Sequence, residues 1–202
     1  MKNQLILIEG LDATGKSTLV NNLSEAIDAV IIRNPPEFLD ERISNNDLRI
    51  FFDELGGSRR REFYRSANFI SSEMARIAMN HSWVIMDRYW PSTATFSKLD
   101  ETQKSWEPLG VYPEGLLEPD IMFLLTVSED ERKARLSKRN IPETDEESKL
   151  FVHHEQRSLI ESGYRAFNPI EVDTSGINPL EVLKIVLQKI ETYSNTAIDY
   201  ME

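Results

Sequence analysis

The sequence has no cysteine, and its basic residues are outnumbered by acidic ones. Without thiols, disulfide bonds and cysteine metal sites are excluded, and this composition fits a reducing compartment. Lys and Arg number 23 against 34 Asp and Glu, so the formal net charge of −11 disfavours a large nucleic-acid surface. No apolar stretch approaches the roughly 18 residues of a membrane span, and the first residues carry no secretory pattern. We therefore expect a cytoplasmic protein with no membrane or nucleic-acid partner.

Short apolar runs alternate with helix-length amphipathic segments along the chain. Strands are predicted at Gln4–Ile8, Ala29–Ile32, Trp83–Met86, Ile121–Val127 and Ile170–Val172. Helices are predicted over Lys16–Ile27, near Ser58–Asn80, after a Ser128/Glu131 capping pattern, and from Asn178 to about Ile190, with a frayed tail beyond Thr192. A second capping pattern at Thr144/Glu147 predicts the start of a further helix. The connecting segment between the two helices, at about 139–147, is predicted to be a lid. This alternation indicates an α/β fold, a five-stranded parallel sheet flanked by helices, in a single domain over 1–202.

The residues directly after the first predicted strand fit the phosphate-loop pattern G-x-x-x-x-G-K-[ST]. They are Gly10, Leu11, Asp12, Ala13, Thr14, Gly15, Lys16 and Ser17, followed by Thr18. In this pattern backbone N–H groups surround phosphate oxygens, the lysine adds positive charge, and the hydroxyl ligates Mg²⁺. The helix that follows turns its positive end to the phosphates. The motif predicts an ATP-type nucleotide site over Gly10 to Thr18.

Polar residues also follow the second and third predicted strands. Ligands of an open parallel sheet bind beyond the carboxyl ends of its strands, which makes these positions candidates for chemistry. Asp87 is predicted to hold Mg²⁺ opposite Ser17; the alternative is a surface aspartate. Arg88 is placed to grip a phosphate with two hydrogen bonds, a geometry that lysine cannot supply.

Phosphoryl transfer needs positive charge around the moving group, and one arginine cluster lies beside the predicted lid. The cluster is Arg132, Arg135, Lys138 and Arg139. Arg135 and Arg139 lie four residues apart on one helix face and are the favoured catalytic pair; the alternative is a solvated face. The triplet Arg59-Arg60-Arg61 is interpreted as a solvated helix start, and His153 and His154 as solvated positions without a role.

Longer strings resemble the thymidylate kinase family of nucleoside monophosphate kinases, over essentially the whole chain. Besides the phosphate loop, they are Asp87-Arg88-Tyr89 with Ser92, the arginine-bearing lid, and Val172-Asp173-Thr174-Ser175. Within the family the chain is most similar to the mitochondrial-type UMP-CMP kinase 2 branch. That similarity rests on Arg60-Arg61-Glu62-Phe63-Tyr64 with Asn68, on Asp87 to Thr95, and on Glu118-Pro119-Asp120 leading into Leu124 to Ser128.

The resemblance implies ATP with Mg²⁺ as donor, a pyrimidine monophosphate as acceptor, and a homodimer packed through helices. It also implies residue roles. Lys16 bridges donor phosphates, Asp12 lies near the acceptor sugar and its phosphate, and Arg88 holds that phosphate. Tyr89, the next residue, is also predicted to bind the acceptor, and the neighbourhood of Arg33 meets the acceptor phosphate.

Two departures from the family pattern matter. Ala13 stands where some members carry a catalytic arginine, so the lid arginines must supply that charge. At the usual thymine-reading positions the chain has Arg65 and Phe69. We predict that Tyr64 and Asn68, one helical turn apart, stack on the base and bond its edge; the alternative is that Tyr64 is a core residue.

Three functions remain open at this point. The first is an ATP-dependent kinase of dTMP or of UMP, CMP, dUMP or dCMP. The second is a deoxynucleoside kinase, which requires a catalytic base near the sugar, either Glu9 or Glu37. The third is a nucleotide-binding regulatory module, which the lack of an N-K-x-D guanine-reading motif disfavours.

Overall fold

The computed structural model describes residues 3–36, 48, 51–52, 54–55, 57–99, 107–138 and 154–199. These ranges contain a parallel sheet of five strands in the order β2-β3-β1-β4-β5. The strands are β1 (Leu5–Gly10), β2 (Val30–Arg33), β3 (Val84–Asp87), β4 (Ile121–Thr126) and β5 (Ile170–Asp173). The five predicted strands and their parallel arrangement are confirmed, with boundaries shifted by at most two residues.

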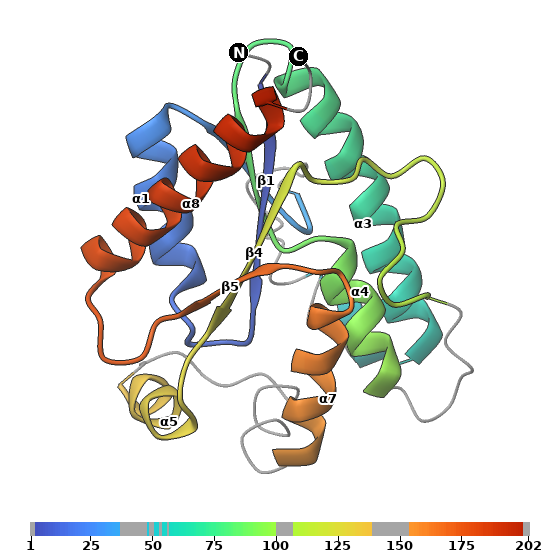
Figure 1. Cartoon of the computed structure of the whole chain (residues 1–202). Coiled ribbons are helices and arrows are strands. Elements are labelled where there is room, and N and C mark those ends of the chain that lie inside the picture. Colours follow the sequence, from blue (N-terminus) through green and yellow to red (C-terminus); the bar gives the residue numbers. More distant parts are fainter. Residues whose placement is uncertain are drawn as a thin grey trace.

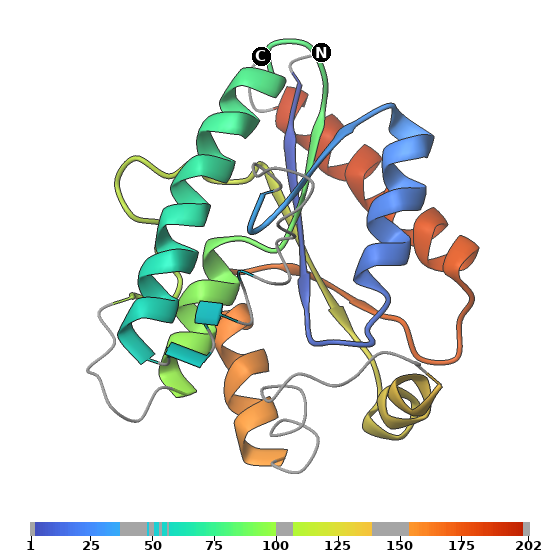
Figure 2. The same cartoon turned by 180° about the vertical axis from the view of Figure 1, so that it is seen from behind.

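Helices cover both faces of the sheet (Figures 1 and 2). One face carries α1 (Lys16–Ile27) and α8 (Pro179–Asp199); the other carries α3 (Gly57–Ala78), α4 (Trp90–Phe96) and α7 (His154–Arg165). The short helices are η1 (Ser97–Leu99), which follows α4, and α5 (Glu129–Ser137), which follows β4. The phosphate loop and α5 therefore lie at the same end of the sheet, the carboxyl end (Figure 1).

The central strand β1 is buried along its whole length because both faces of a parallel sheet are covered. Successive side chains of a strand point to opposite faces. Leu5 and Leu7 accordingly join the core under α4 and α7, whereas Ile6 and Ile8 join the core under α1 and α8. Two apolar layers thus hold β1 in place, and the phosphate loop starts from its rigid end.

The capping prediction for α8 is confirmed. Asn178 Oδ1 accepts hydrogen bonds from the backbone N–H groups of Leu180 and Glu181, both at 3.0 Å, and the Glu181 carboxylate accepts the N–H of Asn178 at 3.0 Å. The predicted fraying beyond Thr192 is wrong, since α8 continues to Asp199. Ile190 anchors the helix in the core, and each added residue then gains one hydrogen bond at little further cost.

The helix predicted to start after Ser128 is confirmed, with Ser128 as the N-cap residue of α5, but the side-chain bonds of a capping box do not form. The Ser128 side chain makes no capping bond, and the Glu131 carboxylate instead accepts from Arg135 Nη2 at 2.6 Å and from the Gly176 N–H at 2.7 Å. The Ser128 N–H, which a capping box would give to Glu131, is instead accepted by Ser175 Oγ at 2.8 Å.

The solvated helix start predicted at Arg59-Arg60-Arg61 is also wrong, at Arg61. This side chain is 4% exposed and donates to the carbonyl of Phe96 at 2.8 Å, because α3 packs along α4. The predicted lid at 139–147, the Thr144/Glu147 pattern and His153 lie outside the described residues. His154 begins α7. Within the described residues no helix is long and apolar enough to cross a membrane.

Candidate active site

The phosphate loop joins β1 to α1 in a conformation that depends on glycine. At Gly10 the φ angle is 144°, and a Cβ atom there would lie 2.4 Å from the carbonyl oxygen of Leu125 on the neighbouring strand. Gly15 caps α1 with a φ of 94°, and Ala13 is also left-handed with a φ of 65°. Thr14 Oγ1 donates to the Leu11 carbonyl at 2.8 Å, which closes the turn. The loop is therefore compact, and its backbone is strained at the non-glycine residue Ala13.

Lys16 lies inside this loop. Its side chain is 7% exposed, its Nζ donates to the Leu11 carbonyl at 2.7 Å, and Nζ lies 3.9 Å from Asp12 Oδ1. Burial, together with the charge of Arg88, lowers the pKa of Lys16 to about 8, although Asp12 acts in the opposite direction. The lysine is thus a desolvated cation at the centre of the loop, where it can exchange the Leu11 carbonyl for phosphate oxygens.

Arg88 follows β3 and is held in position by three elements. Its Nη2 donates to Asp12 Oδ1 at 2.7 Å, and its Nη1 donates to Ser92 Oγ at 3.2 Å and to the Tyr164 hydroxyl at 3.3 Å. Burial opposes the charge, but Asp12 and the neighbouring acidic groups raise the pKa of Arg88 above its ordinary value. The backbone of Arg88 is left-handed, with a φ of 66°, a conformation that costs energy and is common at functional sites.

Glu9, at the end of β1, organises the start of α4. Its Oε1 accepts the backbone N–H groups of Tyr89 at 2.9 Å and Ser92 at 3.2 Å, and its Oε2 accepts the Ser92 hydroxyl at 2.7 Å. The carboxylate is fully buried, and burial raises the pKa of Glu9 although Arg88 opposes this shift. Both oxygens therefore bind α4, and they orient the Ser92 hydroxyl that Arg88 contacts.

Tyr164, from α7, completes the surroundings of Arg88 and was not predicted. Its hydroxyl lies 2.9 Å from Ser92 Oγ, and its side chain is fully buried. It reaches the site because α7 packs closely on α4: a Cβ atom at Gly163 would lie 2.6 Å from Thr95 Cγ2. The glycine preceding this tyrosine was the only local sign in the sequence, since Tyr164 and Arg88 are 76 positions apart.

Of the predicted catalytic arginines, the structure brings Arg135 to the phosphate loop. Its Nη1 donates to the Ala13 carbonyl at 3.1 Å, directly at the position where an arginine is missing. Arg132 is buried and pairs with Glu129 at 3.0 Å. Lys138 is exposed at the end of α5, and Arg139 lies outside the described residues.

The segment after β2 differs from the prediction. Arg33 is exposed and donates to Asn21 Oδ1 on α1 at 3.1 Å, so its side chain does not join the Arg88 cluster. Asn34 points to the opposite face, as the next residue of an extended chain does. Its amide donates to Asn68 Oδ1 at 2.9 Å, and its Oδ1 accepts from Ser71 at 3.1 Å. Asn34, which was not predicted, is therefore the residue of this segment that faces α3.

The predicted acceptor residues on α3 and α4 lie at different depths. Asn68 is fully buried; its Nδ2 donates to Thr93 Oγ1 at 2.8 Å and its Oδ1 binds Asn34, which leaves one donor and one acceptor position on the amide. Tyr64 is half-buried and edge-on to Phe63. The prediction that the Tyr89 side chain meets the acceptor is wrong, because that ring is fully buried in the core and stacks on Tyr112.

The residues proposed for Mg²⁺ have suitable chemistry. Ser17 is exposed in the first turn of α1, and the half-buried Asp87 ends β3, beside β1 in the sheet. Hydroxyl and carboxylate oxygens are the donors that Mg²⁺ takes, generally one or two from the protein with the rest from phosphates and water. The described residues contain no group of three acidic or histidine side chains that could cage a metal alone. This donor set fits a nucleotide-bound Mg²⁺.

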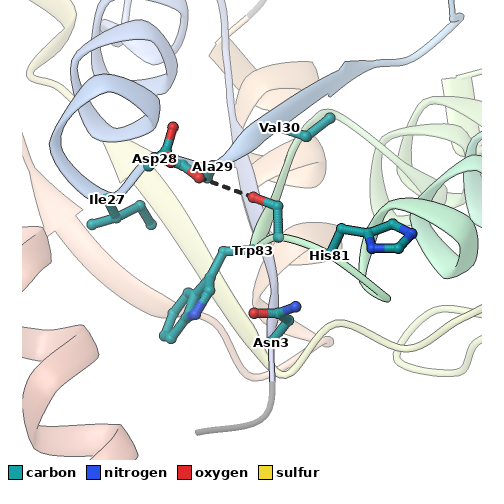
Figure 3. A pocket seen from close by; sticks show the side chains of 8 residues that line it. Asn3, Ile27, Asp28, Ala29, Val30, His81 and Trp83 are labelled. Atoms are coloured by element: carbon teal, nitrogen blue, oxygen red, sulfur yellow. Dashed lines mark hydrogen bonds between the residues drawn. The ribbon is translucent and has the colours of Figure 1, made fainter.

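A separate pocket of about 460 Å³ lies at the amino end of the sheet, the end opposite to the phosphate loop. Figure 3 shows the residues that line it. Asn3, Trp83 and His81 are among its lining residues. Two of its polar side chains are bonded within the protein: Asn3 Nδ2 donates to the Met79 carbonyl at 2.9 Å and Ser82 Oγ to the Asp28 carbonyl at 2.9 Å.

Comparisons with known proteins agree with this geometry. The model of the thymidylate kinase family matches residues 8–175. Human UMP-CMP kinase 2, mitochondrial, is 36% identical over 199 residues, covering 94% of this chain and 43% of that protein, so the chain spans less than half the length of this relative.

Among solved structures, a thymidylate kinase from Candida albicans has a TM-score of 0.67 at 22% identity, covering 96% of this chain and 93% of that one. A deoxyadenosine kinase from M. mycoides has a TM-score of 0.62 at 18% identity, with coverage of 93% and 99%. At these identities the structures establish the shared fold alone. The family model and the human relative each match most of the chain, and the chain therefore belongs to the thymidylate kinase family.

Proposed function

We propose that this protein is an ATP-dependent pyrimidine nucleoside monophosphate kinase, which transfers the γ-phosphoryl group to dTMP or to UMP, CMP, dUMP or dCMP. One observation carries the proposal: Asp12 lies between two cations, 3.9 Å from Nζ of the buried Lys16 and 2.7 Å from Nη2 of the partly exposed Arg88. Lys16 belongs to the donor loop, whereas Arg88 comes from the segment after β3 and also donates to Ser92 on α4 and to Tyr164 on α7. Two neighbouring cations suit two phosphate groups that must meet in line.

The roles follow from these positions. Lys16 and the loop N–H groups bind the donor phosphates, and Ser17 with Asp87 holds Mg²⁺, which neutralises phosphate charge when bound. Arg88 binds the acceptor phosphate, and Asp12 separates the two cations until substrates enter. Arg135 and Arg139 supply charge that the loop lacks at Ala13, with Arg135 already bonded to that residue.

The chemistry of Glu9 favours a monophosphate acceptor over a nucleoside. A deoxynucleoside kinase needs a carboxylate free to take the proton of a 5′-hydroxyl, but Glu9 accepts three hydrogen bonds from Tyr89 and Ser92. Glu37, the other candidate base, lies outside the described residues.

An acceptor panel tests the proposal. ADP release from ATP and Mg²⁺ is measured with dTMP, dUMP, dCMP, UMP, CMP and AMP, and in parallel with the corresponding nucleosides. We expect turnover with several pyrimidine monophosphates and none with AMP, because a pyrimidine pocket excludes a purine by size. Turnover of nucleosides alone supports the deoxynucleoside kinase, and ATP binding without turnover supports a regulatory module.

Base selection gives a prediction at Asn68. The Asn68→Ala change should alter the ratio of kcat/KM between uracil-type and cytosine-type acceptors by roughly tenfold, about the worth of one hydrogen bond. Thr93 and Asn34 fix the amide orientation, so it cannot rotate freely between base edges. Ser71→Ala, which removes a bond to Asn34 alone, serves as the control. If neither variant changes the ratio of kcat/KM between the two acceptor types, another residue selects the base, and Tyr64 is then the next candidate.

The lowered pKa of Lys16 predicts a pH dependence of ATP binding. In the free protein Lys16 loses its proton above about pH 8, whereas bound phosphates keep it charged. Binding should therefore take up a proton above pH 8, and affinity should fall by up to about tenfold per pH unit. Calorimetry near pH 7 and near pH 9, in two buffers of different ionisation enthalpy, measures the uptake. Lys16→Arg should abolish the part of the proton uptake that comes from Lys16. Equal proton uptake by the wild type and this variant would contradict the assignment of the uptake to Lys16.

The homodimer implied by the family is also part of the proposal. Ile70, Met74 and Ile77 are 40%, 38% and 68% exposed and follow one another along the outer side of α3. An apolar helix side suits a two-fold contact with a second copy. Sedimentation velocity measures the oligomeric state. A single domain over 1–202 and a cytoplasmic location are retained as predictions, and cell fractionation tests the latter against the mitochondrial location in the name of the human relative.

A further inference from the structure

Thr174, in the turn after β5, touches the phosphate loop from behind. It is 2% exposed, and its backbone N–H donates to the Thr126 carbonyl at 2.9 Å. Its hydroxyl lies 3.1 Å from the Thr14 carbonyl and 3.0 Å from the Thr126 carbonyl, and accepts from Arg135 Nη1 at 3.1 Å. A hydroxyl has one hydrogen. The hydroxyl can donate this hydrogen to the Thr14 carbonyl, while the Thr174 backbone N–H holds the Thr126 carbonyl.

Arg135 extends the same contact to the preceding loop residue. Its Nη1 donates to the Ala13 carbonyl at 3.1 Å, and its Nη2 donates to the Thr174 carbonyl at 2.8 Å. Glu131 holds the guanidinium from α5 through bonds of 2.6 and 3.1 Å. Two successive carbonyls of the phosphate loop are thus bound by one connected group of side chains from α5 and the β5–α8 turn.

Holding these carbonyls also directs the N–H groups of the loop. In a planar trans peptide the C=O and the next N–H point in opposite directions. With the carbonyls of Ala13 and Thr14 turned to Arg135 and Thr174, the N–H groups of Thr14 and Gly15 point to the other side. Those N–H groups are the ones expected to meet phosphate oxygens. The left-handed Ala13, with a φ of 65°, is a strained position that such bonds can maintain.

We propose that Thr174 and Arg135 are positioning residues that set the direction of the loop N–H groups and hence the affinity for the donor triphosphate. This inference rests on the proposed function, because it takes the loop to bind the ATP phosphates. In this proposal Arg135 acts without any movement of a lid. Its guanidinium holds the Ala13 carbonyl and thereby orients the loop N–H groups that bind the phosphates.

Three single variants test the role of Thr174. Thr174→Val keeps the shape and removes the hydroxyl, Thr174→Ser keeps the hydroxyl, and Ser175→Ala removes a neighbouring hydroxyl that binds Asp173 and the Ser128 N–H instead of the loop. The dissociation constant of ATP without acceptor is measured by calorimetry, and the KM of each substrate by kinetics. We expect Val to weaken ATP binding about tenfold and to change the acceptor KM less than about twofold, with Ser and the Ser175 variant near wild type.

Other outcomes overturn the proposal. If Thr174→Val lowers the melting temperature and leaves ATP affinity unchanged, or raises both KM values equally, Thr174 is merely structural. If the valine variant does not fold, Arg135→Lys provides the test. Lysine keeps the positive charge but lacks the planar guanidinium, so this variant should also weaken ATP binding while changing the acceptor KM little. ATP binding is measured without turnover, so a wild type that binds ATP and phosphorylates no acceptor refutes the proposed function separately.

Discussion

Lys16→Ala is expected to reduce phosphoryl transfer at least about a hundredfold, because it removes positive charge that acts most strongly as the β,γ-bridge breaks. The wild-type lysine is buried and already desolvated, so its charge needs little reorganisation when the triphosphate enters. The measurement is kcat at saturating ATP and acceptor, with circular dichroism and a melting curve to establish that the variant folds.

Lys133→Ala is the matched control for this prediction. Lys133 is 45% exposed on α5, where it pairs with Glu129 at 3.7 Å, and its loss should change kcat by less than about twofold. Near-normal turnover in a folded Lys16→Ala protein would show that the phosphate loop does not supply the catalytic charge.

Arg88→Lys is expected to lower kcat/KM for the acceptor about a hundredfold, since a lysine cannot form two parallel bonds to phosphate. It also cannot reach Asp12, Ser92 and Tyr164 together, as the guanidinium does. ATP affinity, measured without acceptor, should change little because the donor loop has its own cation in Lys16.

The control for this prediction is Arg165→Lys, an arginine that is 44% exposed and pairs with Glu171 at 2.9 Å. This variant should leave kcat/KM for the acceptor and the affinity for ATP nearly unchanged. If Arg88→Lys weakens ATP binding as much as acceptor binding, Arg88 belongs to the donor site, and the assignment of two cations to two substrates fails.

Much of the fold could be predicted from the sequence because its signals are local. The apolar run of β1 and the phosphate-loop pattern both lie within residues 5–17, and the alternation of strands and helices indicated a parallel sheet. The positions of Lys16, Asp12 and Arg88 at strand ends followed from the rule that ligands bind at the carboxyl edge. Family resemblance added their roles, which remain to be tested.

Side-chain direction could not be predicted in the same way. Arg33 and Asn34 are neighbours, yet one binds α1 and the other α3, because successive residues of an extended chain face opposite ways. Arg61 resembles any charged helix residue, and only the packing of α3 along α4 buries it. Tyr89 belongs to the same string as Arg88 but turns into the core.

The sequence by itself therefore determined the phosphate loop, the alternation of the five strands with the long helices along the chain, and the family. The tertiary structure alone decided what holds the site in shape: Tyr164 on Arg88, 76 positions away, and Thr174 on Thr14, 160 positions away. The physical reason is range. Backbone conformation and burial periodicity depend on near neighbours. A hydrogen bond between residues distant in sequence forms only after packing brings its donor and acceptor atoms to about 3 Å from each other.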